Sequence, residues 1–549
     1  MVLEYSLIAL LSPLVGGVIA AFFGKSMGKI FVNASTILGV TISFIFSCML
    51  AMDLYQTSAV FNQNLYTWID IGTFTFHIGL LIDNLTASMM VVVTFVSLMV
   101  HIYTIGYMHD DPGYHRFFAY ISLFTFSMLS LVMSNNFLQL FFGWEAVGVM
   151  SYLLIGFWYT KESAIKANLK AFLVNRVGDL SLILGIGIIF SITGSLDYQT
   201  AFSETQSLTQ TEFKLFDTWT ITALTGACIL LFGGAMGKSA QMPLHVWLPD
   251  SMEGPTPISA LIHAATMVTA GVFLLARMSP LFELSPTALS FVLIIGATTA
   301  LFTGVLGLIQ NDIKRVIAYS TLSQLGYMVA AAGVSAYSAS LFHLMTHAFF
   351  KALLFLAAGS VIVALHHEQD IRKMGGLKSK LPITYLTSLI GSLALIGFPG
   401  FSGFFSKDAL IEAIGHANIV GSGFAYASVL IGVFITALYS FRLFFKVFHG
   451  RIEEHHSDVK ESPLSITLPL ILLAIPSVMI AWPTVGPMVF GSYFGNSIDQ
   501  PDAYQIFGYE FTSAFGFLLH AFSSPVIYIA TSGVLTAYVL YIQLSLIHI

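Results

Sequence analysis

The sequence predicts an all-α, polytopic membrane protein of about 15 transmembrane helices, with two inverted five-helix repeats and discontinuous helices. Three observations predict this fold class. The composition is too apolar for a water-soluble protein, the apolar segments are long enough to cross a bilayer, and the basic residues gather in alternate connections.

The composition comes first. Of 549 residues, 56% are hydrophobic and only 9% are Asp, Glu, Lys or Arg, against ~25% in soluble proteins. The net charge of -6 leaves no basic excess to attract nucleic acid. Cys48 and Cys228 lie far apart in apolar runs, so no disulfide framework or iron–sulfur spacing is present. We therefore expect membrane lipid as the solvent, no nucleic-acid partner, and any redox chemistry on another chain.

The apolar segments give the span count, because a spanning helix needs roughly 20 apolar residues. The first segment follows only Glu4, without a basic region or a small-residue cleavage site, and is expected to be a span that is kept. The predicted spans are 6–24, 30–52, 82–105, 117–134, 136–158, 169–193, 219–239, 257–277, 286–309, 312–331, 337–365, 383–407, 421–448, 464–483 and 522–545.

Two connections are long. Residues 53–81 contain alternating apolar positions (Phe74, Phe76, Ile78 and Leu80) after Gly72, which predicts a small β-hairpin on the outer face. Residues 484–521 form a second outer loop without Lys or Arg.

The basic residues test the span count, because Lys and Arg of short loops collect on the cytoplasmic side. The opposite side carries only Lys214 and Arg277, which places the N-terminus outside. One set of alternate connections carries sixteen: Lys25, Lys29, Arg116, Lys161, Lys166, Lys170, Lys314, Arg315, Arg372, Lys373, Lys378, Lys380, Arg442, Lys446, Arg451 and Lys460. The remaining four, Arg176, Lys238, Lys351 and Lys407, fall within or at the edges of spans.

The spans divide the chain into four expected parts. Residues 1–110 hold three N-terminal spans and the outer hairpin, 117–277 the first five-helix repeat, 286–448 the second repeat, and 464–549 the C-terminal spans. Five is odd, so the two repeats have opposite orientations in the membrane.

Charges inside spans are the candidate functional residues, because a charge at mid-bilayer costs at least ~2.5 kcal/mol and often marks an ion path. Glu145 lies ten residues into the fifth span and needs a partner from another helix. Arg176 and Asp179, three apart on the sixth span, can pair with each other and act on the field around Glu145. The alternative for any such pair is a static ion pair that locks two helices.

Lysines accompany two interrupted helices. Lys238 ends the run Gly233–Gly237 and is followed by several prolines, which predicts two half-helices with the lysine near the break. The run 397–403, Gly-Phe-Pro-Gly-Phe-Ser-Gly, is a second interruption, followed by Lys407 and Asp408. Corresponding interruptions in two halves point to repeats, and an inverted pair can place two half-channels, one opening to each side, joined by the polar row at mid-membrane.

Histidines lie between these two points. His263 on the eighth span is either a satisfied core residue or a proton relay. His343, His347 and Lys351 recur every four residues on one helix face, which suits proton hopping through water. A metal site would need a third and a fourth ligand, and this face offers no carboxylate or thiol.

Five motifs carry a resemblance. The runs 142–148, 168–179, 237–241, 254–267 and 405–408 resemble the antiporter-like proton-pumping subunits of respiratory complex I, and the likeness extends over the whole chain. The resemblance implies that Glu145 switches its interaction with Lys238, that His263, His343, His347 and Lys351 form a central relay, and that Lys407 serves the exit half-channel.

The resemblance also implies the surroundings. No cofactor is expected on this chain, whereas NADH, FMN, iron–sulfur clusters and quinone belong to partner subunits. The expected partners are other membrane-arm subunits of complex I, membrane lipid and protons, and the expected location is an energy-transducing membrane, bacterial plasma (inner) membrane in preference to mitochondrial.

Two alternatives stay open. Family members usually continue into a long lateral helix and a final span, whereas this sequence stops at Ile549. Shorter relatives include subunits of multi-subunit cation/proton antiporters and of inorganic-carbon uptake systems. A passive spacer of the membrane arm, with buried charges as helix locks, is the other alternative.

Overall fold

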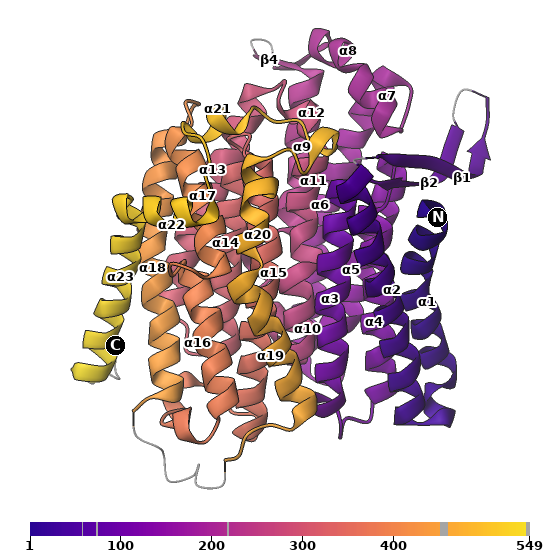
Figure 1. The fold of residues 1–549 in the computed structure, drawn as a ribbon. Coiled ribbons are helices and arrows are strands. Elements are labelled where there is room, and N and C mark those ends of the chain that lie inside the picture. Colours follow the sequence, from indigo (N-terminus) through magenta and orange to yellow (C-terminus); the bar gives the residue numbers. More distant parts are fainter. Residues whose placement is uncertain (58, 73–74, 217–218, 451–458, 545–549) are drawn as a thin grey trace.

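The protein is a bundle of long helices, seen from the side in Figure 1. The structure is a computed structural model that describes residues 1–57, 59–72, 75–216, 219–450 and 459–544. Phe74, Arg451 and residues 545–549, which entered the expectations above, lie outside the described residues. The N-terminus, the strands and the short helices α7, α8 and α21 lie at one end of the bundle, the upper end in Figure 1.

The N-terminal part contains three helices and a hairpin: α1 (Val2–Met27), α2 (Lys29–Thr57), β1 (Phe61–Asp70), β2 (Thr75–Ile82) and α3 (Asn84–Tyr107). Glycines bring α1 and α2 together, since a Cβ at Gly39 would come 2.6 Å from the carbonyl oxygen of Ser12. β1 and β2 pair antiparallel, from Phe61 with Ile82 to Asp70 with Thr75. The predicted hairpin is therefore confirmed.

The next helices are α4 (Tyr114–Val132), α5 (Phe137–Ile155), α6 (Glu162–Thr193) and α9 (Ala223–Lys238). Between α6 and α9 lie the short helices α7 (Tyr198–Ser203) and α8 (Thr205–Gln210) and the paired strands β3 (Glu212–Phe216) and β4 (Trp219–Thr222). Asn136 caps α5 by accepting a hydrogen bond from the amide of Gln139 at 2.8 Å.

The chain becomes irregular after α9. Two 3₁₀ turns, Leu244–Trp247 and Asp250–Glu253, follow Lys238 in place of the helical half that the sequence predicted. The eighth span is also irregular: α10 (Thr256–Ala260) continues into a π-turn at Leu261–Ala265 and a 3₁₀ turn before α11 (Ala270–Arg277). This π-turn was not predicted.

The following part contains α12 (Ser279–Phe282), α13 (Pro286–Leu308), α14 (Ile313–Ala332), α15 (Tyr337–Ala364), α16 (Pro382–Ile396), α17 (Ser402–His416) and α18 (Ser422–Phe448). The predicted interruption separates α16 from α17, where Gly397 (φ +80°) and Gly400 (φ +90°) adopt a left-handed backbone. A Cβ on Gly403 would clash with the carbonyl oxygen of Ala394, so only glycine lets the two helices meet.

The C-terminal part contains α19 (Leu464–Met479), α20 (Ala481–Val485), α21 (Ala503–Phe507), α22 (Ala514–His520) and α23 (Pro525–Tyr538). The segments Leu464–Met479 and Ala481–Phe490 meet at 42°. Pro483 accounts for this bend, because its ring clashes with the carbonyl four residues earlier, at Met479. α23 packs beside α18 (Figure 1).

The span count is lower by strict criteria than the sequence predicted. Within the described residues, 11 helices are long and apolar enough to cross a membrane, and 12 if the bent pair is one span. A described helix nevertheless lies within each of the 15 predicted segments, some of them short, such as α9, or polar, such as α14. The structure is thus a multi-pass, mainly helical membrane protein.

Three basic residues assigned to connections are in fact buried. Arg277, Lys314 and Arg442 have side chains within helices and expose 4% or less. Each has an internal partner, for instance the carbonyl oxygen of Gly254 for the Lys314 ammonium at 2.9 Å. A count of basic residues from sequence treats them as solvated, because helix ends cannot be placed to within a turn.

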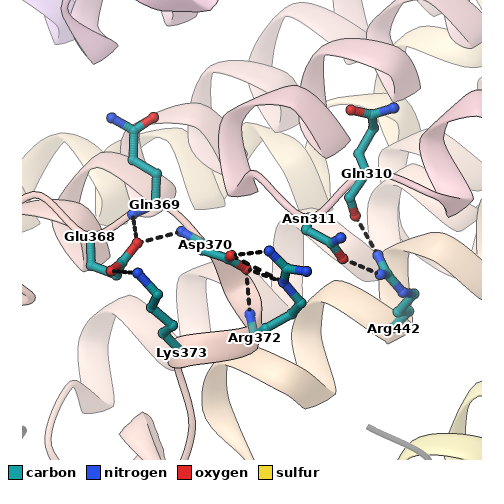
Figure 2. A network of polar contacts seen from close by, with 8 residues as sticks. All are labelled: Gln310, Asn311, Glu368, Gln369, Asp370, Arg372, Lys373 and Arg442. Atoms are coloured by element: carbon teal, nitrogen blue, oxygen red, sulfur yellow. Dashed lines mark hydrogen bonds and ion pairs between the residues drawn. The ribbon is translucent and has the colours of Figure 1, made fainter. Parts of the chain in front are cut away.

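At the lower end of the bundle, the connection from α15 to α16 is tied to the connection from α13 to α14 (Figure 2). The amide of Ile313 donates to the carbonyl of Gln369 at 2.9 Å, and that of Ile371 to the carbonyl of Asn311 at 2.8 Å. The Asp370 carboxylate accepts from the Arg372 guanidinium at 2.6 to 3.0 Å. Arg442 of α18 donates to Gln310 and Asn311.

This network predicts a local pH dependence. Hydrogen bonds from the Arg372 side chain lower the pKa of Asp370, and the amide of Asp370 and the Lys373 ammonium lower the pKa of Glu368. A lowered folded-state pKa stabilises the connection above the ordinary carboxyl pKa of ~4, and this stabilisation is lost as the pH falls through the folded value. Hydrogen-exchange protection of the Ile313 and Ile371 amides should therefore fall below pH ~4.

The matched control is Asp370→Asn, which removes one titrating group and should flatten the pH dependence of protection at both amides. Equal protection of the wild-type amides on both sides of pH ~4 would contradict the prediction.

Candidate functional site: a row of buried ionisable groups

Four charged side chains from three helices alternate in sign. The Arg176 guanidinium of α6 donates to Glu145 of α5 at 2.5 Å and lies 3.9 Å from Asp179. Asp179 in turn lies 3.6 Å from the Lys238 ammonium at the end of α9 and accepts from Trp144 Nε1 at 2.8 Å. The interhelical partner that Glu145 was expected to need is present, and it is Arg176.

The pairing differs from the expectation in two respects. Arg176 and Asp179 do form the expected ion pair at 3.9 Å, but Arg176 is closer to Glu145, and Asp179 is the nearest carboxylate to Lys238. Sequence spacing could not reveal this, because i,i+3 neighbours compete with partners that arrive only when helices pack. Asp179 therefore lies between the two members of the expected Glu145–Lys238 switch.

Small residues place Lys238 in this cluster. A Cβ on Gly178 of α6 would come 3.0 Å from the Cα of Gly237, so the two helices approach without side chains between them. A Cβ on Gly148 of α5 would lie 2.9 Å from the Lys238 ammonium. Lys238 is fully buried, whereas the side chain of Arg176 is 44% exposed on the outside of this chain.

His263 lies within the π-turn of the eighth span. Its Nε2 is 3.0 Å from the hydroxyl of Ser251, in the second 3₁₀ turn after Lys238. The ring of Trp247 lies 6.2 Å from the imidazole, and its Nε1 donates to the carbonyl of Gly237 at 3.0 Å. Trp247 thus bridges the Lys238 end of α9 and His263. A π-turn often occurs at functional sites.

The ladder on α15 is fully buried. His343 and His347 have ring centroids 6.1 Å apart, and Lys351 donates a hydrogen bond to the hydroxyl of Ser320 on α14. His343 Nδ1 lies 2.8 Å from the Ser406 hydroxyl on α17, and its Nε2 lies 3.0 Å from Gln324 Oε1 on α14. The ladder therefore ends beside the residue that precedes Lys407.

Lys407 and Asp408 lie in the second turn of α17, shortly after the break that separates it from α16. The Lys407 ammonium lies 5.3 Å from the ring centroid of Tyr327. Lys407 and Asp408 are 1% and 3% exposed. The structure thus gathers the site residues into two groups, with His263 between them. The first, at α9, extends from the buried Lys238 to the exposed Arg176 and includes Glu145 and Asp179; the second, at α15 and α17, is fully buried and holds His343, His347, Lys351, Lys407 and Asp408.

Many of these groups lack a fixed hydrogen-bond partner. Within the described part of the chain, buried polar atoms without one include Glu145 Oε1, Lys238 Nζ, His263 Nδ1, both ring nitrogens of His347, Lys407 Nζ and Asp408 Oδ2. Each such atom costs free energy in a membrane interior unless water hydrogen-bonds to it. The arrangement therefore favours a hydrated row rather than a set of locked pairs.

Sequence reasoning missed the hydroxyls and the amide that line this row. Ser320 and Gln324 lie four residues apart on α14, and Ser406 lies next to Lys407. The signal was present, because two polar residues at helical spacing inside a span share one face.

Sequence reasoning also missed an ion pair. Arg277 of α11 donates to both carboxylate oxygens of Asp83 at 2.5 and 3.0 Å, and to the Thr86 hydroxyl at 2.8 Å. Both charged side chains expose 4% or less. The pair is bidentate and joins α11 to the start of α3, so it fits a static helix lock.

No group of three or more His, Cys, Asp and Glu residues suited to a metal ion occurs among the described residues. Cys48 and Cys228 are free thiols.

Comparison with known proteins identifies the class of membrane protein to which this fold belongs. A family model described as NADH:quinone oxidoreductase/Mrp antiporter, TM matches residues 134–438, and one described as complex I chain 5 N-terminus matches residues 68–118. The solved Mrp complex from Dietzia sp. has a chain with TM-score 0.77 and 24% identity, covering 97% of this chain and 56% of that one. An archaeal membrane-bound sulfane sulfur reductase gives TM-score 0.75 and 24% identity, covering 86% and 75%. The fold is that of an antiporter-like membrane protein.

Relatives that are similar over most of the chain identify the family within this class. NADH-quinone oxidoreductase subunit L of Neisseria meningitidis is 57% identical, covering 98% of this chain and 84% of the relative. NADH-ubiquinone oxidoreductase chain 5 of Marchantia polymorpha is 50% identical, covering 87% of this chain and 72% of the relative. Subunit L of Rhodobacter capsulatus is also 50% identical, covering 89% of this chain and 70% of the relative. The chain belongs to the subunit L and chain 5 family of NADH-quinone oxidoreductase, complex I.

Proposed function

We propose that the buried row carries the protons that this family translocates, entering near His263, passing Lys351, His347 and His343, and leaving by Lys407. The chain is a proton-translocating membrane subunit of NADH:quinone oxidoreductase, driven by quinone reduction elsewhere in the complex. The observation that carries the residue assignment is the set of buried ionisable atoms without fixed partners.

Arg176 supplies a switch for the row. When Arg176 holds Glu145, as at 2.5 Å here, Asp179 is left to Lys238 at 3.6 Å. A shift of Arg176 to Asp179 removes the carboxylate from Lys238 and favours release of its proton. Unit charges ~4 Å apart interact by about 4 kcal/mol at an effective dielectric constant of ~20, and a proton moved against 100 mV needs about 2.3 kcal/mol. The free energy of one such rearrangement is therefore large enough to move one proton against this potential.

An entrance for protons lies at the lower end of the bundle. A cavity of ≈ 590 Å³ there is lined by residues that include Lys161, Glu253 and Lys314. Glu253 follows Ser251 by two residues, and the Ser251 hydroxyl contacts His263. Hydrated carboxylates at the cavity therefore lead to the first imidazole of the row.

Lys351 tests whether the row transfers protons or only holds helices. Lys351→Ala removes the group, and Lys351→Arg keeps the charge but cannot release it, because the arginine pKa is above 12. We expect both variants to lower the number of protons moved per quinone reduced in reconstituted vesicles, with assembled complex retained.

The exposed Lys166, paired to Glu162 at 2.7 Å, gives the matched control Lys166→Arg, which should leave the ratio unchanged. A wild-type ratio in Lys351→Arg would favour the helix-lock alternative and contradict the assignment.

A cation/proton antiporter is the second candidate, favoured by the fold likeness to the Mrp complex. Its related alternative is an inorganic-carbon uptake partner. Proton translocation that requires sodium ions would favour the antiporter, and translocation that continues without sodium would favour the complex I assignment.

The finer assignments belong to the same proposal. The two interruptions beside Lys238 and Lys407 support two inverted five-helix repeats over 117–277 and 286–448, within about 15 spans. The exposed Arg176 and the partly buried Glu145 lie at membrane depth, which favours another membrane-arm subunit as their cover. NADH, FMN, iron–sulfur clusters and quinone are assigned to partner subunits, and the bacterial plasma membrane is favoured by the bacterial relatives at 56–57% identity.

A further inference from the structure

Beyond Lys407, a second group of ionisable side chains continues along α17 toward the upper end of the bundle. Asp408 and Glu412 lie one helical turn apart, on the same face of the helix. Glu412 Oε2 accepts a hydrogen bond from the Tyr509 hydroxyl at 2.7 Å, and Glu412 Oε1 lies 3.2 Å from His520 Nδ1. Tyr509 follows α21, and His520 ends α22, so both come from the outer C-terminal segment.

Exposure increases step by step along this group. Lys407 exposes 1% and Asp408 3%, the Glu412 side chain 12%, and the His520 side chain 48%. Such a gradient leads from the buried interior, where Lys407 Nζ and Asp408 Oδ2 have no hydrogen-bond partner among the described residues, to the solvated surface. Asp408, whose Oδ2 has no partner among the described residues, is the donor side of the path, and Glu412 lies one helical turn further along α17.

The contacts at the outer end are specific. The rings of Tyr509 and His520 stack with centroids 5.1 Å apart. Gly508 (φ +77°) brings the chain against a further imidazole, since a Cβ there would lie 2.6 Å from Cε1 of His416. The Tyr509 phenol and the His520 imidazole therefore both contact the Glu412 carboxylate, and the imidazole can exchange a proton with it or with water.

We propose that Glu412, clasped by Tyr509 and His520, is the proton outlet of this chain. Asp408 passes a proton to the Glu412 carboxylate, and Glu412 passes it to the half-exposed His520, which releases it to water at the outer face. The inference rests on the proposed function, because it extends the row that ends at Lys407. The Tyr509 hydroxyl holds the carboxylate in place between the two exchanges.

The alternative is a purely structural clasp that fastens the outer segment to α17. Glu412→Gln separates the two roles, because glutamine can still accept from Tyr509 but cannot carry a proton. Glu412→Asp keeps the acid. The matched control is Glu510→Gln, which removes an exposed carboxylate next to Tyr509.

The experiment uses the whole complex with the variant chain, reconstituted into vesicles, and measures protons moved per quinone reduced together with the amount of assembled complex. We expect Glu412→Gln and His520→Gln to lose most of this chain's contribution to the ratio, Glu412→Asp to keep most of it, and Glu510→Gln to match the wild type. Quinone reduction itself should continue in an uncoupled membrane.

A wild-type ratio of protons moved per quinone reduced in Glu412→Gln overturns the proposal that Glu412 is the proton outlet. Should that variant fail to assemble, His520→Gln decides, and an unchanged ratio there overturns it. Loss of assembly in Glu412→Gln and Tyr509→Phe alike, with normal pumping by the assembled fraction, assigns the clasp a structural role and also overturns it. A normal ratio in Lys238→Ala would instead refute the proposed function, whereas a fall in Lys238→Ala alone would refute only the outlet.

Discussion

Replacement of Lys238 by alanine is expected to abolish the contribution of this chain to proton translocation. Lys238 is fully buried, and only Asp179 lies within ion-pair distance of its ammonium among the described residues. Alanine removes the proton-binding group and leaves Asp179 facing Arg176 alone, so the alternation of partners ends. The measurement is the ratio of protons moved per quinone reduced in vesicles, at equal amounts of assembled complex.

The control for this prediction is Lys214→Ala. Lys214 is exposed on β3, outside the bundle, and its removal should change neither the ratio nor assembly. Glu145→Gln provides a second test, because it weakens the hold on Arg176 and should lower the ratio as well. Wild-type pumping by Lys238→Ala complexes would show that proton transfer along the row does not depend on the switch at Lys238.

Replacement of Asp83 by alanine is expected to cause the largest loss of stability. Arg277 would remain buried with an uncompensated charge, and breaking a buried pair in this way costs about 3–5 kcal/mol. The complex should therefore assemble poorly and unfold at a lower temperature in detergent. The fraction that assembles should translocate protons at the wild-type ratio, because the pair lies outside the proposed row.

Asp53, exposed on α2, gives the control Asp53→Ala, for which no change in thermal unfolding is expected. Joint replacement of Asp83 and Arg277 by apolar residues of similar volume should cost less than Asp83→Ala, since no charge is left unpaired. An Asp83→Ala complex with normal stability and a lowered pumping ratio would move this pair into the proton path.

These two predictions separate two kinds of buried charge. Arg277 makes three hydrogen bonds to Asp83 and Thr86, which hold its guanidinium in one position. The ammonium groups of Lys238 and Lys407 donate no hydrogen bond to any of the described residues. A group that must bind and release a proton is better served by the second arrangement, because a fixed partner stabilises one protonation state.

Most of the elements followed from the sequence. The apolar segments marked the spans, the alternation around Ile78 and Leu80 marked the hairpin, and glycine with proline marked the break between α16 and α17. The π-turn at His263 did not follow, since local sequence there has no breaker. The bend after Met479 was also not predicted, although Pro483 lies at the position that causes it.

The site was predicted as a set of residues but not as a set of pairs. Every ionisable residue named in the spans lies in the interior or at its edge, because lipid tolerates such groups only where protein or water receives them. For Arg176 the predicted pair with Asp179 is present at 3.9 Å, but the closer contact, to Glu145 at 2.5 Å, was not predicted. Arg277 was assigned to a connection and is instead locked to Asp83.

The sequence alone determined that the chain is a membrane protein, where most of its helices lie, and which ionisable side chains are unfavourable in lipid and therefore candidates for function. These properties depend on composition and on spacing along one helix. Only the tertiary structure decided that Asp179 stands next to Lys238, that Ser406 joins the α15 ladder to Lys407, and that Glu412 meets Tyr509 and His520. Contacts between residues far apart in the chain depend on how helices pack, and no periodicity within one helix encodes them.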